Sequence, residues 1–596
     1  MEIREYLDQH NLITDGAFGT YYAEKYHTRE MPELANTLHP DRVMEIYGEY
    51  ITAGAKLIRT NTFASNTAVL QKSLSDVEFN IKKSAELAKK AVKQYADRSK
   101  VFIAGDIGPI LSDGEQEFET AEQEYYHIVK TFVENGISIL DFETFPDMEH
   151  ILPAIQKIKE EHNVFVMVSF SVNQFGYSAS GLGAKRLISD AAKIKCIDAV
   201  GLNCGVGPVH MYDILKKLEL PQNLYLTAIP NAGYPALSRN HLQFGNTPSY
   251  FAEKMKNIIE LGVDIAGGCC GTNPEFISKM SQITDVIPKR AKNYASDEQH
   301  KHKKAVRCGF LYDENGIKKE KKFIAVELAP PFNADDEKLL ESAHMLKNSD
   351  VDVLTFPDSP SGRTRVDSVL MAEKVRRETG MEVMPHICCR DKNALAIRSL
   401  FMGAQINDIN NMLIITGDPL SSAARQTVKA VFNSDSVGLM KIAQEMNEEI
   451  FADRPLSYGG AINQGRKNLE IEIKRVKSKM EAGAEFFLTQ PVFTKDDAER
   501  LRYIKEQTGA CIFCGIMPLV SKKNAMFMKN EIAGVNVTDE IIKRYPENGT
   551  KEDGEAVGVA LAKEVIKMVE DFTDGYYFTF PFNRVYLLQK ILPDKN

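Results

Sequence analysis

Residues 264–272 read Asp-Ile-Ala-Gly-Gly-Cys-Cys-Gly-Thr, a short apolar segment that ends in glycine and polar residues. A segment of this length is typical of a buried strand, and the polar tail marks the end of that strand. Seven similar segments precede it, and amphipathic stretches such as Phe79–Tyr95 and Ala121–Asn135 separate most of them. The full set is Leu12–Thr20, Lys56–Phe63, Val101–Pro109, Ser138–Phe145, Val164–Val172, Ala199–Gly205, Leu224–Gly233 and Asp264–Thr272. Eight strands that alternate with helices predict a (β/α)8 barrel over residues 1–288.

The same pattern returns in the second half of the chain. The candidate strands there are Phe323–Pro331, Asp352–Ser359, Glu382–Arg390, Asn411–Pro419, Ser457–Asn463, Glu485–Phe493, Cys511–Leu519 and Gly575–Asn583. Two doubly wound sheets would also alternate strands with helices, but eight segments in each half favour barrels. The sequence therefore predicts an α/β protein with two TIM barrels in tandem, the second over residues 310–596. Residues 289–309 are rich in Lys and His and predict a charged linker.

Composition limits the functions that the chain can have. The chain has 596 residues, which is too long for one core, and its net charge of −9 argues against nucleic acid as a partner. No apolar run approaches the ~18 residues of a membrane span, and no signal peptide opens the chain. An odd number of cysteines, nine, predicts free thiols and a cytoplasmic protein. Whether the chain forms a homo-oligomer stays open.

Three cysteines in the first half have the pattern of a metal site. Cys269 and Cys270 are adjacent between glycines at the end of the eighth strand, and Cys204 follows the sixth. The carboxyl ends of barrel strands meet at one face, so we expect the three thiolates to converge. Three protein ligands and an open position are typical of catalytic zinc, and a substrate thiol in that position would be deprotonated. The pattern therefore indicates alkylation of a thiol.

The polar groups at the strand ends of the first half resemble a known family. The motifs are Asp15-Gly16-Ala17-Phe18-Gly19-Thr20, Asn61-Thr62-Phe63, Gly201-Leu202-Asn203-Cys204 and Gly268-Cys269-Cys270-Gly271. They resemble the zinc-dependent homocysteine S-methyltransferases over essentially the whole first half. The resemblance implies that Cys204, Cys269 and Cys270 hold Zn2+ and that the sulfur of homocysteine is the fourth ligand.

The same resemblance implies where the rest of homocysteine binds. Glu143 and Asp15 are similar to the partners of its amino group, and the backbone at Gly16 lies near its carboxylate. Asn231, at the end of the seventh strand, is a further substrate-binding candidate. The motifs leave the methyl donor open. A good donor carries its methyl group on a positively charged atom, and the absence of tryptophan counts modestly against betaine, so a sulfonium compound is favoured.

The second half resembles the 5,10-methylenetetrahydrofolate reductases. The motifs are Val326-Glu327-Leu328-Ala329-Pro330-Pro331, His386-Ile387-Cys388-Cys389, Ile415-Thr416-Gly417-Asp418-Pro419, Lys479-Met480-Glu481-Ala482-Gly483-Ala484 with Thr489-Gln490-Pro491, and Gly515-Ile516-Met517-Pro518. The resemblance implies a barrel that binds FAD along its strand ends, with NAD(P)H and folate as substrates in turn.

Carried over by residue, this second resemblance assigns roles to the strand ends. Glu327 is similar to the acid that helps open the methylene bridge, Asp418 faces flavin and pterin, and Gln490 orients the pterin. The residues implied to contact FAD are Thr355, His386, Gly417, Asp418, Lys479 and Ala461, the last at a position where a tyrosine is expected. The aromatic residue that stacks on the ligands is displaced or replaced, and Phe527 is the nearest candidate.

Two other readings of the chain remain. The first barrel could use the folate product with a separate corrinoid protein, although the chain has no Asp-x-His-x-x-Gly cobalamin signature. Alternatively, one half could be a regulatory module without activity, against which the intact cysteine set and the intact set Glu327, Asp418 and Gln490 both argue. Cys511 and Cys514 have redox spacing but lie in a predicted strand, so we expect them in the core.

Overall fold

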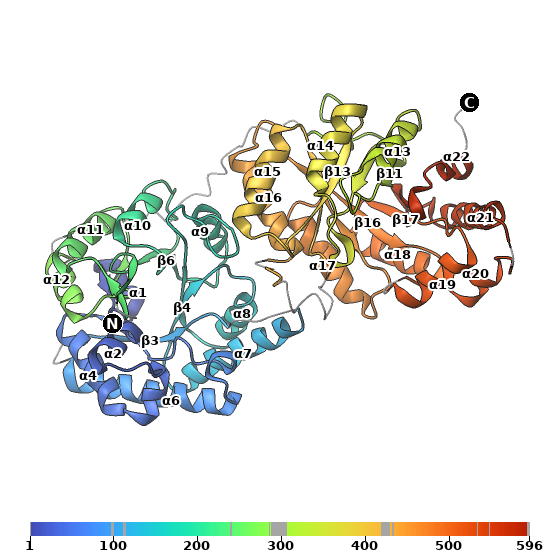
Figure 1. Cartoon of the computed structure of the whole chain (residues 1–596). Helices are drawn as coiled ribbons and strands as arrows, with labels where there is room; N and C mark the ends of the chain where they lie inside the picture. The colour runs from blue at the N-terminus through green and yellow to red at the C-terminus, as the bar shows by residue number, and fades with distance from the viewer. Residues whose placement is uncertain are drawn as a thin grey trace. The chain divides into compact units, whose positions relative to one another are not determined.

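The computed structural model describes residues 2–96, 100–110, 115–238, 241–284, 287, 307–418, 429–431, 434–532, 535–547 and 549–592. For residues 115–120, 235–238, 241–244 and 361 it describes only the backbone. The chain divides into two compact units, Met1–Gln299 and His300–Asn596, each built around its own sheet (Figure 1). Most of the predicted linker, residues 289–309, lies outside the described residues.

The first unit is an eight-stranded parallel barrel with strand order β1-β10-β7-β6-β5-β4-β3-β2. A parallel bridge between Thr14 and Leu57 joins β1 to β2 and closes the ring. The strands are β1 (Leu12–Ile13), β2 (Leu57–Arg59), β3 (Phe102–Ile107), β4 (Ile139–Phe145), β5 (Phe165–Phe170), β6 (Ala199–Asn203), β7 (Tyr225–Ile229) and β10 (Ile265–Ala266). Each strand lies within one of the eight predicted segments. The segments read as continuous apolar runs because the strands of a parallel barrel are covered on both faces.

Helices follow the strands of this barrel along the chain. They are α1 (Ile3–Gln9), α2 (Gly19–Tyr26), η1 (Pro32–Leu34), α3 (Ala35–Leu38), α4 (Pro40–Thr52), α5 (Thr67–Leu70), α6 (Leu74–Tyr95), α7 (Glu115–Glu134), α8 (Leu152–Glu161), α9 (Ala184–Ala192), α10 (Pro208–Leu215), α11 (Pro248–Glu260) and α12 (Pro274–Thr284). An antiparallel hairpin, β8 (Pro235–Ser238) and β9 (His241–Phe244), interrupts the alternation between β7 and α11. The sequence analysis did not predict this hairpin, because it lies beyond Gly233, where the seventh predicted segment ends.

The second unit is a closed parallel barrel in which the strands follow the chain order, and the fold class is therefore confirmed as two tandem (β/α)8 barrels. Its strands are β11 (Phe323–Glu327), β12 (Val353–Phe356), β13 (Val383–Cys388), β14 (Asn411–Ile415), β15 (Ser457–Ile462), β16 (Phe486–Pro491), β17 (Ile512–Ile516) and β18 (Gly575–Thr579). Its helices are α13 (Glu337–Lys347), η2 (Pro360–Gly362), α14 (Ser368–Thr379), α15 (Ala394–Ile406), α16 (Ser436–Glu449), α17 (Leu469–Glu481), α18 (Lys495–Thr508), α19 (Lys522–Glu531), α20 (Asp539–Lys543), α21 (Lys551–Val569), η4 (Pro581–Asn583) and α22 (Leu587–Ile591).

A segment at the start of each unit fills the amino-terminal end of its own barrel. In the first unit, Ile3 and Leu7 of α1 join the core cluster formed by the beginnings of the strands. In the second, Phe310 takes the same place, and its backbone N–H donates to Asn411 Oδ1 at 2.9 Å. Both barrels are thus sealed at one end, which leaves the carboxyl ends of the strands for chemistry.

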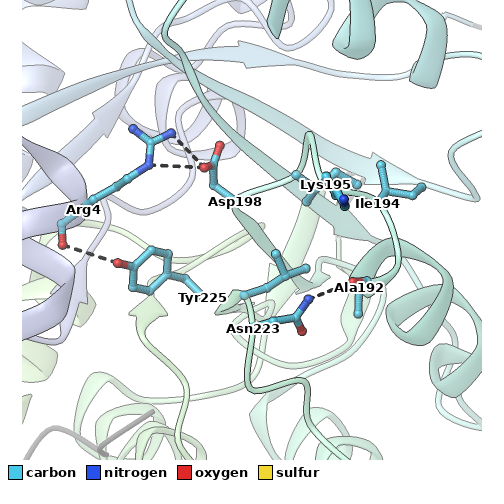
Figure 2. A pocket seen from close by; sticks show the side chains of 9 residues that line it. Arg4, Ala192, Ile194, Lys195, Asp198, Asn223 and Tyr225 are labelled. Carbon is cyan, nitrogen blue, oxygen red and sulfur yellow. Dashed lines mark hydrogen bonds and ion pairs between the residues drawn. The ribbon is translucent and has the colours of Figure 1, made fainter. Parts of the chain in front are cut away.

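A pocket of about 360 Å3 lies at the sealed end of the first barrel. Figure 2 shows Arg4 and Asp198 facing each other there, with Arg4 Nη2 donating to Asp198 Oδ1 at 2.8 Å. Asn223 and Tyr225 also lie in the wall, and each donates to a backbone carbonyl. These polar groups bind one another, as expected at the end of a TIM barrel that serves stability. None of the described helices is long and apolar enough to cross a membrane.

Candidate active sites

The three predicted cysteines come together at the carboxyl end of the first barrel. Cys204 follows β6, Cys269 and Cys270 follow β10, and the three sulfur atoms lie within 4.8 Å of one another. The chain turns sharply at Cys204, which has a φ of 53°, and at Gly205, which has a φ of 67°. A Cβ at Gly205 would lie 2.2 Å from the carbonyl oxygen of Val172, so only glycine fits this turn.

The cysteine cluster stabilises one negative charge in its interior. Hydrogen bonds from Cys269, Cys270, the Gly205 backbone and Asn231 lower the pKa of Cys204 to about 3, although burial opposes the change. The same thiolate raises the pKa of Cys270 to about 12 and that of Cys269 well above its usual range. Three thiolates at this spacing would require a cation between them. The set of sulfur donors suits Zn2+, which binds cysteine readily in tetrahedral sites.

A buried arginine, Arg59, lies beside the cysteines and was not singled out in the sequence analysis. It ends β2 and is only 6% exposed. Its Nε donates to Asp15 Oδ1 at 2.8 Å, and its Nη1 donates to Glu143 Oε2 at 2.6 Å. The pKa values of Asp15 and Glu143 are raised by burial, and Arg59 opposes the rise at both. The two predicted homocysteine ligands therefore share one cation.

The remaining substrate-binding candidates also lie at this end of the barrel. Gly16 offers its carbonyl oxygen to Arg59 Nη2 at 3.0 Å, and a Cβ at Gly16 would lie 2.7 Å from Thr272 Oγ1. Asn231 has a buried Oδ1 atom that accepts no hydrogen bond from the described residues. Close packing at Gly16 leaves room only for backbone, as its predicted role requires.

Two further carboxylic acids, Asp106 and Asp141, are buried below Glu143 in the strands. They lie side by side on β3 and β4, and neither oxygen of Asp141 accepts a hydrogen bond from the described residues. Burial, followed by the charge of Glu143, raises the pKa of Asp141 to about 8, while Arg59 lowers it. Burial likewise raises the pKa of Asp106 well above its usual range. Asp141 is therefore mostly protonated at neutral pH.

Asp141→Asn is expected to stabilise the first barrel, and the gain should grow with pH. The ordinary pKa of the Asp141 carboxyl is 3.8, and it rises to about 8 on folding. Folding therefore takes up a proton between about pH 4 and pH 8, and wild-type stability falls across this range. Near pH 4 the variant should match the wild type, whereas above pH 8 its free energy of unfolding should be higher by on the order of 1 kcal/mol or more.

Denaturation curves of both proteins at about pH 4.5 and about pH 8.5 measure this difference in the free energy of unfolding. The control is Asp198→Asn, which removes an acceptor of Arg4 and Lys159 and should destabilise the barrel at both pH values. If Asp141→Asn and the wild type were equally stable at the higher pH, folding would not raise the pKa of Asp141, and this prediction would be wrong.

The second barrel places Glu327 at the end of β11, beside Tyr577 of β18. The Tyr577 hydroxyl donates to Glu327 Oε2. Burial raises the pKa of Glu327, and the hydrogen bond from Tyr577 and the charge of Arg365 oppose the rise. The net rise keeps a proton on Glu327 at higher pH than usual, as an acid catalyst requires. Tyr577 was not predicted, because only the closure of the barrel between β18 and β11 brings it to Glu327.

Two of the predicted FAD contacts carry polar atoms without partners. Thr355 Oγ1 in β12 and His386 Nε2 in β13 are buried and make no hydrogen bond with the described residues. Burial lowers the pKa of His386 to about 3, so its ring is neutral. Buried polar atoms are normally paired, and a bound group that offers partners would satisfy both. The residues present therefore fit a polar cofactor such as FAD.

The other predicted contacts lie after β14, at the end of β15 and on α17. Lys479 donates to the carbonyl oxygen of Ala461 at 2.8 Å. Gly417 has a φ of 94°, and a Cβ there would lie 3.0 Å from Cys388 Cβ. Arg390, which was not predicted, donates to the carbonyl oxygen of Asp418 at 3.2 Å. Arg390 is also paired with Asp391, with Nη2 2.6 Å from Oδ2, and burial lowers the pKa of Lys479.

The remaining positions singled out in the second half lie on β16, on α19, after Asp418 and at β17. Gln490 is half-buried in β16, and Phe527 is 53% exposed on α19. Residues 419–428, which follow Asp418, lie outside the described residues and include Pro419 of the predicted motif. Cys514 is buried within β17, and both it and Cys511 are free thiols.

Comparison with known proteins assigns a family to each half. Residues 12–284 match the family model for homocysteine S-methyltransferase, and residues 314–591 match the model for methylenetetrahydrofolate reductase. Two curated relatives, both named methionine synthase, are 26% identical over 303 residues (Mycobacterium leprae) and 25% identical over 318 residues (Mycobacterium tuberculosis). The matches cover 47% and 49% of this chain but only 25% and 26% of those proteins.

Solved structures of the Escherichia coli homocysteine methyltransferase MmuM also match. Its oxidized and metallated forms are each 22% identical, with a TM-score of 0.41, and cover 47% of this chain and 98% and 99% of their own. The two family matches together span nearly the whole chain without overlapping. The chain thus joins members of two enzyme families, a homocysteine S-methyltransferase domain followed by a methylenetetrahydrofolate reductase domain.

Proposed function

We propose that the chain is a bifunctional one-carbon enzyme. Its first barrel transfers a methyl group to homocysteine and forms methionine, and its second barrel reduces 5,10-methylenetetrahydrofolate to 5-methyltetrahydrofolate with NAD(P)H. The observation that carries the proposal is the convergence of three cysteine sulfur atoms within 4.8 Å at the carboxyl end of the first barrel. The family match of the second half supports the reductase activity.

In the first barrel, Cys204, Cys269 and Cys270 would hold the zinc ion. Zinc bound there lowers the pKa of a substrate thiol, so that the sulfur is a nucleophile at neutral pH. Glu143 accepts a hydrogen bond from the ammonium group of homocysteine, and backbone near Gly16 faces its carboxylate. These contacts orient the amino acid so that its sulfur points toward the cysteines.

The methyl donor is proposed to be a sulfonium compound. A positively charged sulfur leaves as a neutral thioether, which makes it a good leaving group. The chain has no tryptophan, the aromatic residue that best surrounds a quaternary ammonium group. The composition therefore favours a sulfonium donor over betaine.

In the second barrel, Thr355, His386, Gly417, Asp418, Ala461 and Lys479 would contact FAD. The flavin supplies the hydride chemistry when bound. Glu327 donates a proton to a folate nitrogen, which helps open the methylene bridge. Gln490 would orient the pterin ring, and Asp418 would face both the flavin and the pterin.

Assays of the full chain test both activities. Purified protein should be yellow, contain one equivalent of zinc and oxidise NAD(P)H in the presence of methylenetetrahydrofolate. Homocysteine should become methionine with S-methylmethionine or S-adenosylmethionine as donor, in a panel that also includes betaine and methyltetrahydrofolate. Methylation that occurs only with methyltetrahydrofolate and an added corrinoid protein would support the corrinoid alternative instead. A colourless protein without zinc would contradict both halves of the proposal.

A further inference from the structure

Arg59 uses four of the five N–H groups of its guanidinium to bind protein acceptors. Besides Asp15 and Glu143, its guanidinium donates through Nη2 to the carbonyl oxygens of Gly16 and Gly268, each at 3.0 Å. These partners belong to three different strand ends, those of β1, β4 and β10. Gly268 directly precedes Cys269 in the chain. Arg59 therefore ties the cysteine loop to the two carboxylates.

The two carboxylates differ in how much of their bonding capacity Arg59 uses. Asp15 accepts from the Arg59 side chain at Oδ1 and from the Arg59 backbone N–H at Oδ2, both at 2.8 Å. Glu143 accepts from Arg59 and from Asn203 Nδ2 at the same oxygen, Oε2, at 2.6 Å and 3.2 Å. Among the described residues, nothing donates to Glu143 Oε1. Both oxygens of Asp15 are thus bound by Arg59, whereas Glu143 has an oxygen to offer.

We infer that Arg59 is a positioning residue that divides the work of the two acids. Asp15 anchors Arg59, Arg59 anchors Glu143 through Oε2, and Glu143 Oε1 is left to accept from the ammonium group of homocysteine. This inference rests on the proposed methyltransferase function and changes one part of it, because Asp15 acts through Arg59 and does not bind the amino group. The substrate class that such a site selects is an α-amino thiol.

Electrostatics supports this division. Burial opposes the charge on Arg59, but Asp15, Glu143, Asp106 and Asp141 raise its pKa well above the usual range. A guanidinium in this setting stays charged at every working pH. Loss of one partner from a buried ion pair leaves the other uncompensated, and such losses are strongly destabilising. Without Arg59, the ammonium group would meet acids that no longer hold a fixed position or charge.

The test compares Arg59→Lys, Arg59→Gln and Arg59→Ala with the wild type, all as full-length zinc-loaded protein. In Arg59→Gln, the KM for homocysteine should rise about 10-fold or more, equivalent to about 1.4 kcal/mol, with a smaller change in kcat. The KM for the methyl donor should stay the same. Homocysteine binding measured by calorimetry without donor should weaken by the same factor. The KM for homocysteine of Arg59→Lys should lie between those of the wild type and Arg59→Gln, because lysine keeps the charge but not the forked geometry.

Three controls separate positioning from general damage. Arg4→Gln breaks an ion pair at the opposite end of the same barrel and should leave the KM for homocysteine unchanged. Asp15→Asn should reproduce the effect of Arg59→Gln, and the double variant should be no worse than either single one, since both act along one path. Added guanidinium should partly restore homocysteine binding in Arg59→Ala.

The possible results lead to distinct conclusions. A wild-type KM in Arg59→Gln, or additive effects of Asp15→Asn and Arg59→Gln, would overturn the inference. So would loss of zinc from all three Arg59 variants with no recovery in guanidinium, because Arg59 would then be only structural. If none of the methyl donors supports methylation of homocysteine by the wild type, the proposed function fails. The calorimetric comparison then still decides whether Arg59 governs binding of the amino acid.

Discussion

Replacement of Cys204 by serine is expected to remove zinc from the protein and to abolish methionine formation, while reduction of methylenetetrahydrofolate continues. A serine hydroxyl does not become an anionic ligand near neutral pH as a thiol does. Changes outside the ligand set already cost metal sites about 10- to 100-fold in affinity, so loss of a ligand should cost more than about 100-fold. Zinc content by elemental analysis and methionine formation by chromatography measure the two effects.

The matched control for this variant is Cys196→Ser. Cys196 is a half-buried free thiol of the same barrel and does not belong to the cysteine cluster. It should keep both zinc and methylation. Cys269→Ser and Cys270→Ser should behave like Cys204→Ser, whereas one equivalent of zinc retained in any of the three would rule out a three-cysteine site.

Glu327→Gln is expected to separate the two substrates of the second barrel. Opening the methylene bridge needs a proton, so oxidation of NAD(P)H by methylenetetrahydrofolate should slow by about 100-fold or more. Oxidation of NAD(P)H by an artificial quinone acceptor needs no acid on folate and should continue at a near-normal rate. Steady-state absorbance at the nicotinamide band, with each acceptor in turn, measures both reactions.

Tyr577→Phe provides the comparison for Glu327→Gln. Tyr577 donates to Glu327 and favours its carboxylate form, so the pKa of Glu327 should rise further without the hydroxyl. An acid with a higher pKa stays protonated longer, and folate reduction in Tyr577→Phe should therefore persist to higher pH than in the wild type. If Glu327→Gln slows both acceptors equally, or no longer binds FAD, Glu327 is a structural residue.

The fold was predictable because each strand leaves a local mark in the sequence. A buried parallel strand gives an apolar run, and its end gives a glycine or polar residue, so the positions of Cys204, Cys269 and Glu327 could be read directly. The predicted runs were longer than the strands, since the residues beyond each strand end are buried in the barrel mouth. In the case of β10, only Ile265 and Ala266 of the nine-residue segment pair as a strand.

The interior partnerships of the sites were not predictable in the same way. Arg59 meets Glu143 across 84 residues of sequence, and Tyr577 meets Glu327 across 250. Such pairs depend on the register between strands and on barrel closure, neither of which leaves a local mark. One signal was present: Arg59 is a cation inside the apolar run Lys56–Phe63. A charge in a predicted buried strand requires a partner, and the nearby strand ends offered two acids, Asp15 and Glu143.

The segments that fill the amino-terminal ends of the two barrels bear on how the chain is synthesised. Arg4 of α1 precedes its acceptor Asp198 by 194 residues along the chain, and Phe310 precedes its acceptor Asn411 by 101 residues. On the ribosome, each of these segments emerges long before its partners and must remain undocked until most of its own barrel has been translated. Each of these segments belongs to the same unit as the strands that it covers. The first barrel can therefore complete its core before the second one is synthesised. The growing chain therefore exposes the unfinished core of only one barrel at a time, which limits the time available for aggregation.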